Sequence, residues 1–400
     1  MKSNYRYIVK AFMAMAVIAG TTSCDDFLDR EPMSSISPET YYSTAAQLEA
    51  NLNDEYPNVL PSFGQWTYGI FGEDKGTDNQ IEVNANDRYT QDRWKVPHSE
   101  SDNWKFERIY RINFFLSEAL PKFGEDMSGS QNTISGSVAT IKHYIGEMYF
   151  LRAYEYFKKL QLFGDFPIIN QPLADEMEAL REASKRFPRN EVARFIISDL
   201  DKAYAYMSDV DMATTRINKD VAMLVKSRVA LFEATWLQNF KGTAFVPGGE
   251  GWPGASLHNN YQYPSGNIDN EVKYFLEQAV EASKLVADKY KGSLTENTGV
   301  LQQSADDPSN PYFDMFAQED LSDVKEVLLW RQYARGLSTH NINAAAGRGN
   351  YRIGLTRGFV QNFLMKDGTP VYAHGSYADG DGYYCLLYTS PSPRDRSLSR

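Results

Sequence analysis

Apolar residues recur with helical spacing through most of the chain, separated by stretches in which this period is lost. The periodic segments cover residues 37–53, 101–120, 137–163, 188–207, 219–240 and 270–290. Ser37-Pro38-Glu39 supplies a cap, a proline and an acid for the first of these helices. Gly164 followed by Pro167 ends the third helix. In residues 327–333, apolar and polar side chains alternate weakly, which predicts a strand.

The helical segments are arranged as adjacent, antiparallel pairs. Residues 101–120 pair with 137–163, and residues 188–207 pair with 219–240. Small residues alternate with large ones in Ala203-Tyr204-Ala205-Tyr206, which favours close helix stacking. This pattern is typical of tetratricopeptide repeats, and an ordinary helical bundle is the alternative. We therefore predict a mostly α fold, a tetratricopeptide-like helical-pair scaffold with long irregular loops and little β-structure.

The first residues have the pattern of a bacterial export signal that ends at a cysteine. Basic residues precede an apolar run from Ala11 to Gly20, and small residues then lead to Cys24. The run of about ten residues is too short to span a bilayer of roughly 30 Å. We expect residues 1–23 to be a lipoprotein signal peptide and Cys24 to be lipidated, which would anchor the chain to a membrane. The alternative is an ordinary secretory signal with an incidental cysteine.

Charge and cysteine content narrow the classes of function. The formal net charge is −11, and loss of the three cations Lys2, Arg6 and Lys10 with the signal peptide makes it −14. Such an acidic chain argues against nucleic-acid binding. The chain has 2 cysteines, so acylation of Cys24 leaves Cys385 without an intramolecular disulfide partner.

The end of the chain differs abruptly in composition. Residues 385–400 change from Gly, Asp and Tyr to Ser, Pro and Arg, and resemble translated adapter or vector sequence. A genuine disordered tail is the alternative. We therefore expect the main domain to cover residues 24–384 and its native C-terminal part to be missing.

Loops rich in aromatic residues are the candidate ligand site. Tyr, Phe and Trp make up 14% of the chain, and rings that a core does not require can stack on sugar rings while polar neighbours bind hydroxyls. Residues 56–101 and 241–269 are long for loops of a compact domain, which indicates function. The stacking candidates are Trp66, Tyr89, Trp94, Trp252, Tyr261 and Tyr263, and the polar candidates are Asp74, Asn79, Arg93, Asn259 and Asn260. Packing within the loop itself is the alternative for each residue.

Catalytic and metal chemistry have little support. Glu73 with Asp74 or Asp78 could form the pair of carboxylates that a glycosidase needs. With 52 acids in the chain, however, such neighbours arise by chance. The 5 histidines lack metal-ligand spacing, and no phosphate-binding loop or other cofactor motif is present. We predict structural roles for His143, Arg152 and Asp165. The chain is therefore expected to be neither an enzyme nor a cofactor protein.

Several short motifs, in order, resemble the SusD/RagB-like family of surface nutrient-binding lipoproteins of Bacteroidota. They are Cys24-Asp-Asp-Phe-Leu-Asp29, Ile109-Tyr-Arg-Ile-Asn-Phe-Phe-Leu116, Gly146-Glu-Met-Tyr-Phe-Leu-Arg-Ala-Tyr154, Leu162-Phe-Gly-Asp-Phe-Pro167, Asn310-Pro-Tyr-Phe-Asp-Met-Phe316, Glu326-Val-Leu-Leu-Trp-Arg331 and Leu364-Met-Lys-Asp-Gly-Thr-Pro370. The resemblance implies four tetratricopeptide-like pairs, an irregular face that binds ligand, and a longer chain.

The resemblance also implies a place and a partner. The acids after Cys24 resemble a surface-export tag, which implies the outer face of the outer membrane. The partner would be a SusC-like TonB-dependent outer-membrane transporter, to which the protein delivers an oligosaccharide. A peptide cargo, a helical-repeat scaffold that binds protein, and a surface glycosidase are the alternatives, in that order.

Overall fold

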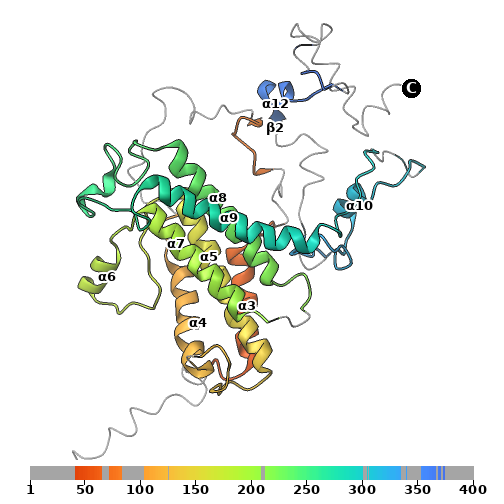
Figure 1. The fold of residues 1–400 in the computed structure, drawn as a ribbon. Coiled ribbons are helices and arrows are strands. Elements are labelled where there is room, and N and C mark those ends of the chain that lie inside the picture. Colours follow the sequence, from red (N-terminus) through yellow and green to blue (C-terminus); the bar gives the residue numbers. More distant parts are fainter. Residues whose placement is uncertain are drawn as a thin grey trace, which may run out of the picture.

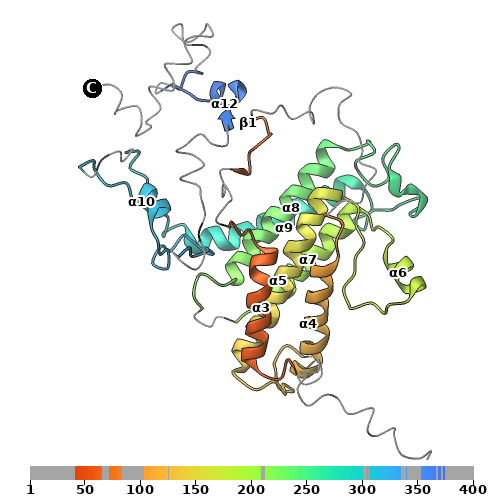
Figure 2. The ribbon, with the colours of Figure 1, turned by 180° about the vertical axis from the view of Figure 1, so that it is seen from behind.

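Helices form the body of the molecule, and each main helix packs against the next main helix along the chain. The computed structural model describes residues 41–64, 72–82, 103–124, 126–208, 212–300, 304, 306–334, 339, 353–365, 368–370 and 373. The main helices are α3 (Ala45–Val59), α4 (Glu107–Phe123), α5 (Val138–Phe163), α7 (Arg189–Tyr206), α8 (Lys219–Asn239) and α9 (Ile268–Tyr290). In Figures 1 and 2 they lie side by side, and contacts join α4 to α5, α5 to α7, α7 to α8 and α8 to α9.

Helix α5 is the centre of this arrangement. It touches α3, α4, α7 and α8, and buried side chains occur on all of its faces. Its N-cap Ser137 accepts a hydrogen bond from the Thr140 amide (3.4 Å), and Gly164, with φ of 68°, ends it. Glycine suits this position because other residues rarely adopt a positive φ. The predicted helix over 137–163 is confirmed.

Burial on all sides forces the charged residues of α5 to find partners inside the protein. Arg152 is 3% exposed, and its guanidinium bonds both carboxylate oxygens of Asp199 on α7 (2.7 and 2.9 Å). It also donates to Asn113 Oδ1 on α4 (2.9 Å) and to the Asn170 carbonyl (3.1 Å). Buried charges are tolerated only when paired and hydrogen-bonded. Arg152 therefore ties three segments together, and its predicted structural role is confirmed.

A second buried charge lies earlier on α5. Glu147 accepts hydrogen bonds from the Tyr56 hydroxyl (2.8 Å) and from the Arg216 guanidinium (2.7 and 3.0 Å). His143, one turn before, contacts the same carboxylate (3.2 Å) and the Ile217 carbonyl (3.0 Å). These contacts join α3, α5 and the segment just before α8, and they give His143 the structural role predicted for it.

Close approach of α5 to α7 depends on Gly146. A Cβ atom at this position would lie 2.8 Å from the Met207 amide nitrogen and 2.9 Å from the Ala203 carbonyl oxygen. Backbone atoms cannot move aside as side chains can, so any larger residue would push the helices apart. The glycine that opens one of the family-like motifs thus allows the central helix crossing.

Two predicted boundaries and one predicted element are wrong. The first helix was predicted over 37–53, but it begins at Ala45, behind a capping box formed by Thr44 and Gln47, and ends at Val59. Residues 37–40 lie outside the described residues. The predicted 101–120 helix runs from Glu107 to Phe123. Residues 327–333 form no strand, because their backbone has no ladder partner and Trp330 instead bonds Thr214.

Several smaller elements were not predicted. The strands β1 (Gln80–Glu82) and β2 (Ile353–Leu355) pair antiparallel, and the short helices α10 (Pro311–Ala317) and α12 (Arg357–Gln361) follow α9 in the chain. Helix α6 (Met177–Ala183) buries none of its residues and stands away from the other helices in Figure 1. The fold is mostly α with little β-structure in the described segments, as predicted. No helix in those segments has both the length and the apolar character needed to cross a bilayer.

Replacing Gly146 by alanine should lower the free energy of unfolding by about 2 kcal/mol, although alanine is the better helix former. The cause is the contact between the new methyl group and the α7 backbone. Urea denaturation measures the change. Gly292→Ala is the matched control, because a Cβ there has no heavy atom within 4 Å, and it should stay within about 0.5 kcal/mol. Equal effects of the two substitutions would contradict the close crossing.

Candidate functional site

The long loop between α8 and α9 is held down by one buried tryptophan. Trp252 is 5% exposed, and it precedes the short 3-10 helix η3 (Pro253–Ser256). Its indole N–H donates to Asp165 Oδ2 (2.7 Å). Asp165 Oδ1 accepts from the Arg189 amide (2.9 Å), so the same carboxylate caps the first turn of α7. Burial raises the pKa of Asp165. Asp165 thus has the structural role predicted for it.

The other aromatic residues of the loop pack on Trp252 and on each other. Its ring lies 5.9 Å from that of His258 and 5.5 Å from that of Tyr261, and Tyr261 lies 5.3 Å from Tyr263. The Tyr261 hydroxyl donates to Asn190 Oδ1 (3.0 Å). Burial raises the pKa of Tyr261 and of Tyr263, so both hydroxyls stay protonated donors at neutral pH. The rings therefore form one cluster that fixes the loop.

Below this cluster lie buried ion pairs that the sequence did not reveal. Arg189 bonds Glu233 (2.9 to 3.2 Å) and stacks 4.1 Å above the Trp236 ring. Glu271 accepts from Arg194 (2.7 and 2.9 Å) and from Asn190 (3.0 Å). Although burial acts to raise the pKa of Glu271, these hydrogen bonds lower it. The loop thus rests on a rigid, charge-paired base built from α7, α8 and α9.

The structure gives the predicted loop residues different surroundings. Trp252 was predicted to stack on a sugar; it is 5% exposed, so little of its surface is open to such a ligand. Tyr261 and Tyr263 are half-buried, and the Tyr263 hydroxyl donates a hydrogen bond to the Pro247 carbonyl (2.6 Å). Asn259 is exposed in the same loop. Its neighbour Asn260, also a predicted polar residue, is exposed beside it.

The remaining predicted residues lie elsewhere. Asp74 is exposed in the turn before β1, on a segment separate from the α8–α9 loop. Trp66, Tyr89, Arg93 and Trp94 lie outside the described residues. Across the part of the chain that is described, no group of His, Cys, Asp or Glu is placed to hold a metal ion.

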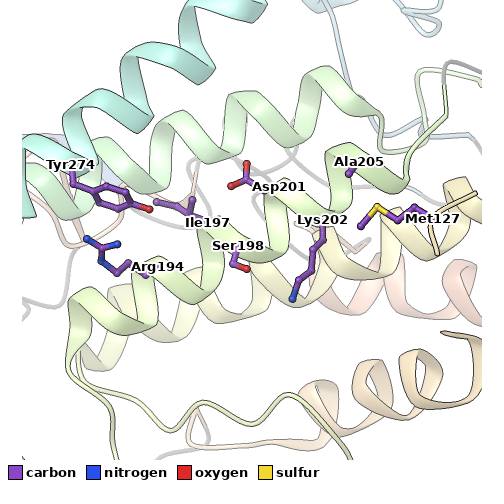
Figure 3. A pocket seen from close by; sticks show the side chains of 8 residues that line it. All are labelled: Met127, Arg194, Ile197, Ser198, Asp201, Lys202, Ala205 and Tyr274. Carbon is purple, nitrogen blue, oxygen red and sulfur yellow. The ribbon is translucent and has the colours of Figure 1, made fainter. Parts of the chain in front are cut away.

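A shallow groove lies on the outer face of α7, where α9 and the loop after α4 approach it (Figure 3). Its volume is about 360 Å³, within the range of small-ligand sites. The lining residues are Met127, Arg194, Ile197, Ser198, Asp201, Lys202, Ala205 and Tyr274. Sequence analysis missed it, because its residues come from three segments whose proximity only the fold reveals.

Comparison with known proteins places the chain in a family. A SusD-like family model, described as starch-binding and associating with the outer membrane, matches residues 26–231. The chain belongs to the SusD-like family. The matched range covers about half of the chain, from the segment after Cys24 through most of α8, and it confirms the resemblance expected from the motifs.

Individual SusD-like relatives agree with this assignment. The SusD-like protein P2 of Formosa agariphila is 25% identical over 253 residues, which cover 60% of this chain and 46% of that protein. This SusD-like chain thus spans about half the length of the curated relatives it matches. A SusD-like protein of Bacteroides fragilis has the same fold, with a TM-score of 0.57 and 19% identity over 92% of this chain and 62% of its own. A SusD-like carbohydrate-binding protein of the same species gives a TM-score of 0.54 with 14% identity over 84% of this chain and 57% of its own.

Replacing Trp252 by phenylalanine should lower the free energy of unfolding by about 1–3 kcal/mol, because the Asp165 carboxylate loses a buried hydrogen bond. Hydrogen exchange should quicken across residues 243–258. Leu257→Ala, in the same loop but exposed, serves as the control and should change neither quantity. Unchanged exchange in Trp252→Phe would mean that the tryptophan does not hold the loop.

Proposed function

We propose that this SusD-like protein binds an oligosaccharide at the outer surface of the outer membrane and passes it to a SusC-like TonB-dependent transporter. The observation that carries the proposal is the family match over residues 26–231, whose description is starch-binding and associating with the outer membrane. The resemblance to this family implies a ligand-binding face carried on a helical scaffold, and the described residues supply such a scaffold in α3 to α9.

The proposed binding surface is borne by loops. Trp66, Tyr89 and Trp94 supply ring faces for stacking, and Asp74 and Asn259 supply hydrogen bonds to hydroxyls. Trp252 contributes by holding the α8–α9 loop through Asp165, while Tyr261 and Tyr263 are half-buried in the same loop. A fixed loop loses little entropy on binding, which favours capture by a preformed site.

The proposal involves no bond cleavage and no cofactor. Hydrolysis of a glycan needs two carboxylates that face each other across the sugar, one of them kept protonated at neutral pH. Among the described residues, burial raises the pKa of Asp165, Glu233 and Glu55, and each of these acids is bonded to a partner within the protein. Their hydrogen bonds fix the fold, so we assign the protein to capture and not to catalysis.

Anchoring follows from the N-terminal pattern. We propose that residues 1–23 are removed and that Cys24 carries acyl groups inserted in the outer membrane. Lipid on a cysteine at the start of the mature chain would hold the binding domain at the cell surface, within reach of the transporter.

A glycan array probed with residues 24–400 should show binding without release of sugar. In calorimetry with a glycan that binds, Trp94→Ala should lose about 1–3 kcal/mol of binding free energy, as aromatic stacking platforms do. Trp104→Phe, in a ring cluster with Phe163 and Phe166, is the control for a structural tryptophan and should bind as wild type does. Binding of peptides in place of glycans would overturn the cargo, and released sugar would overturn the non-catalytic role.

Substitution of Cys24 by serine should abolish metabolic labelling with a palmitate analogue and move the protein from the membrane fraction to the soluble one. The chain supplies its own control, because Cys385→Ser leaves the proposed lipid site intact and should keep both the label and the membrane association. Continued labelling of Cys24→Ser would contradict lipidation at this residue.

A further inference from the structure

The groove on α7 is long and shallow. Its α7 residues run from Arg194 to Ala205, which is about 16 Å along a helix at its usual rise. Figure 3 shows Tyr274 of α9 at one end, above Arg194, and Met127 at the other end. Ser198, Asp201 and Lys202 lie between them, so polar side chains fill the middle of the groove.

The charges of the groove are already balanced within the protein. Arg194 is bonded through two nitrogens to Glu271, and Lys202 lies 3.7 Å from Asp199. Asp201 accepts from Lys226 (2.7 Å). An ionic ligand would have to compete with these pairs, so the groove favours a neutral ligand.

Hydrogen-bonding capacity nevertheless remains unused. The hydroxyls of Ser198 and Tyr274 have no hydrogen-bond partner among the described residues, and Ser198 is exposed. Burial raises the pKa of Tyr274, so its hydroxyl is a donor at neutral pH. The Asp201 side chain is 50% exposed, and a carboxylate has several acceptor sites beyond the one that Lys226 occupies. Donors and acceptors thus alternate along the groove.

Apolar surface accompanies these polar groups. Met127 is 41% exposed at one end, and Ala205 is exposed beside it. Arg194 lies 3.7 Å from the centre of the Tyr274 ring and fixes the ring in place. A neutral ligand with many hydroxyls and apolar C–H faces matches this mixture of surfaces.

We propose that the α7–α9 groove is a second saccharide site, distinct from the loop surface, that binds a short neutral oligosaccharide. Ser198, Tyr274 and Lys202 donate to sugar hydroxyls, Asp201 accepts from them, and Met127 contacts a ring face. The inference rests on the proposed function in that the cargo is a glycan. A second site on the same chain would let one molecule hold two points of a polysaccharide, which strengthens capture through effective concentration.

Calorimetry and saturation-transfer NMR with maltoheptaose, laminariheptaose and cellohexaose test the site in the chain that covers residues 24–400. We expect the wild type to show a second binding event. Ser198→Trp should remove that event by filling the groove, and Tyr274→Phe should weaken it about fivefold because only one hydroxyl is lost. Ser117→Trp and Tyr110→Phe, exposed on α4, are the matched controls and should leave both events unchanged.

The outcomes separate the groove from the proposed function. One binding event that Ser198→Trp and Tyr274→Phe leave unchanged would overturn the groove while glycan capture stands. One event that Trp94→Ala abolishes, with no effect of the groove variants, would also overturn the groove and leave capture in place. Absence of binding by every glycan would overturn the proposed function and the groove with it. Circular dichroism checks that each variant is folded.

Discussion

Burial of α5 on all sides is the constraint on which the rest of the structure depends. A helix with no solvent face can carry charges only if its neighbours complete their hydrogen bonds. Arg152 therefore requires Asp199 on α7, and Glu147 requires Tyr56 and Arg216. Because these contacts join particular atoms, they set the positions of the surrounding helices more narrowly than apolar packing alone would do.

The sequence predicted the helices where local signals define their ends. The stop at Gly164 acts within a few residues, so α5 ends as expected. In the structure, side chains of Ser137 and Asn218 cap the starts of α5 and α8, which lie where the periodicity placed them. The start of α3 was wrong because the Thr44–Gln47 capping box lies further along the chain than the signal at Ser37. Weak alternation in 327–333 could not tell a strand from an extended segment, because a strand also needs a pairing partner.

For the candidate site, the sequence predicted which residue types gather in the loop but not how their side chains are arranged. Aromatic enrichment identified the α8–α9 loop, but not the direction in which its rings face. That direction depends on Asp165, which is 87 positions from Trp252 in sequence. The groove shows the same limit, since Arg194 and Tyr274 meet only when α7 and α9 pack. A site whose residues come from distant segments leaves no local sequence pattern. The family motifs are local patterns, because each contains residues needed at one place in the fold, such as Gly146 at the helix crossing.

The two partners of Glu147 have a consequence for the order of folding. Tyr56 precedes α5 in the chain, but Arg216 follows Glu147 by 69 positions. Until that arginine is in place, docking α5 would leave a half-paired carboxylate in apolar surroundings. A chain that lacks the segment before α8 should therefore keep α5 loosely packed. The central helix is thus fixed only when residues on both sides of it in the sequence have folded against it.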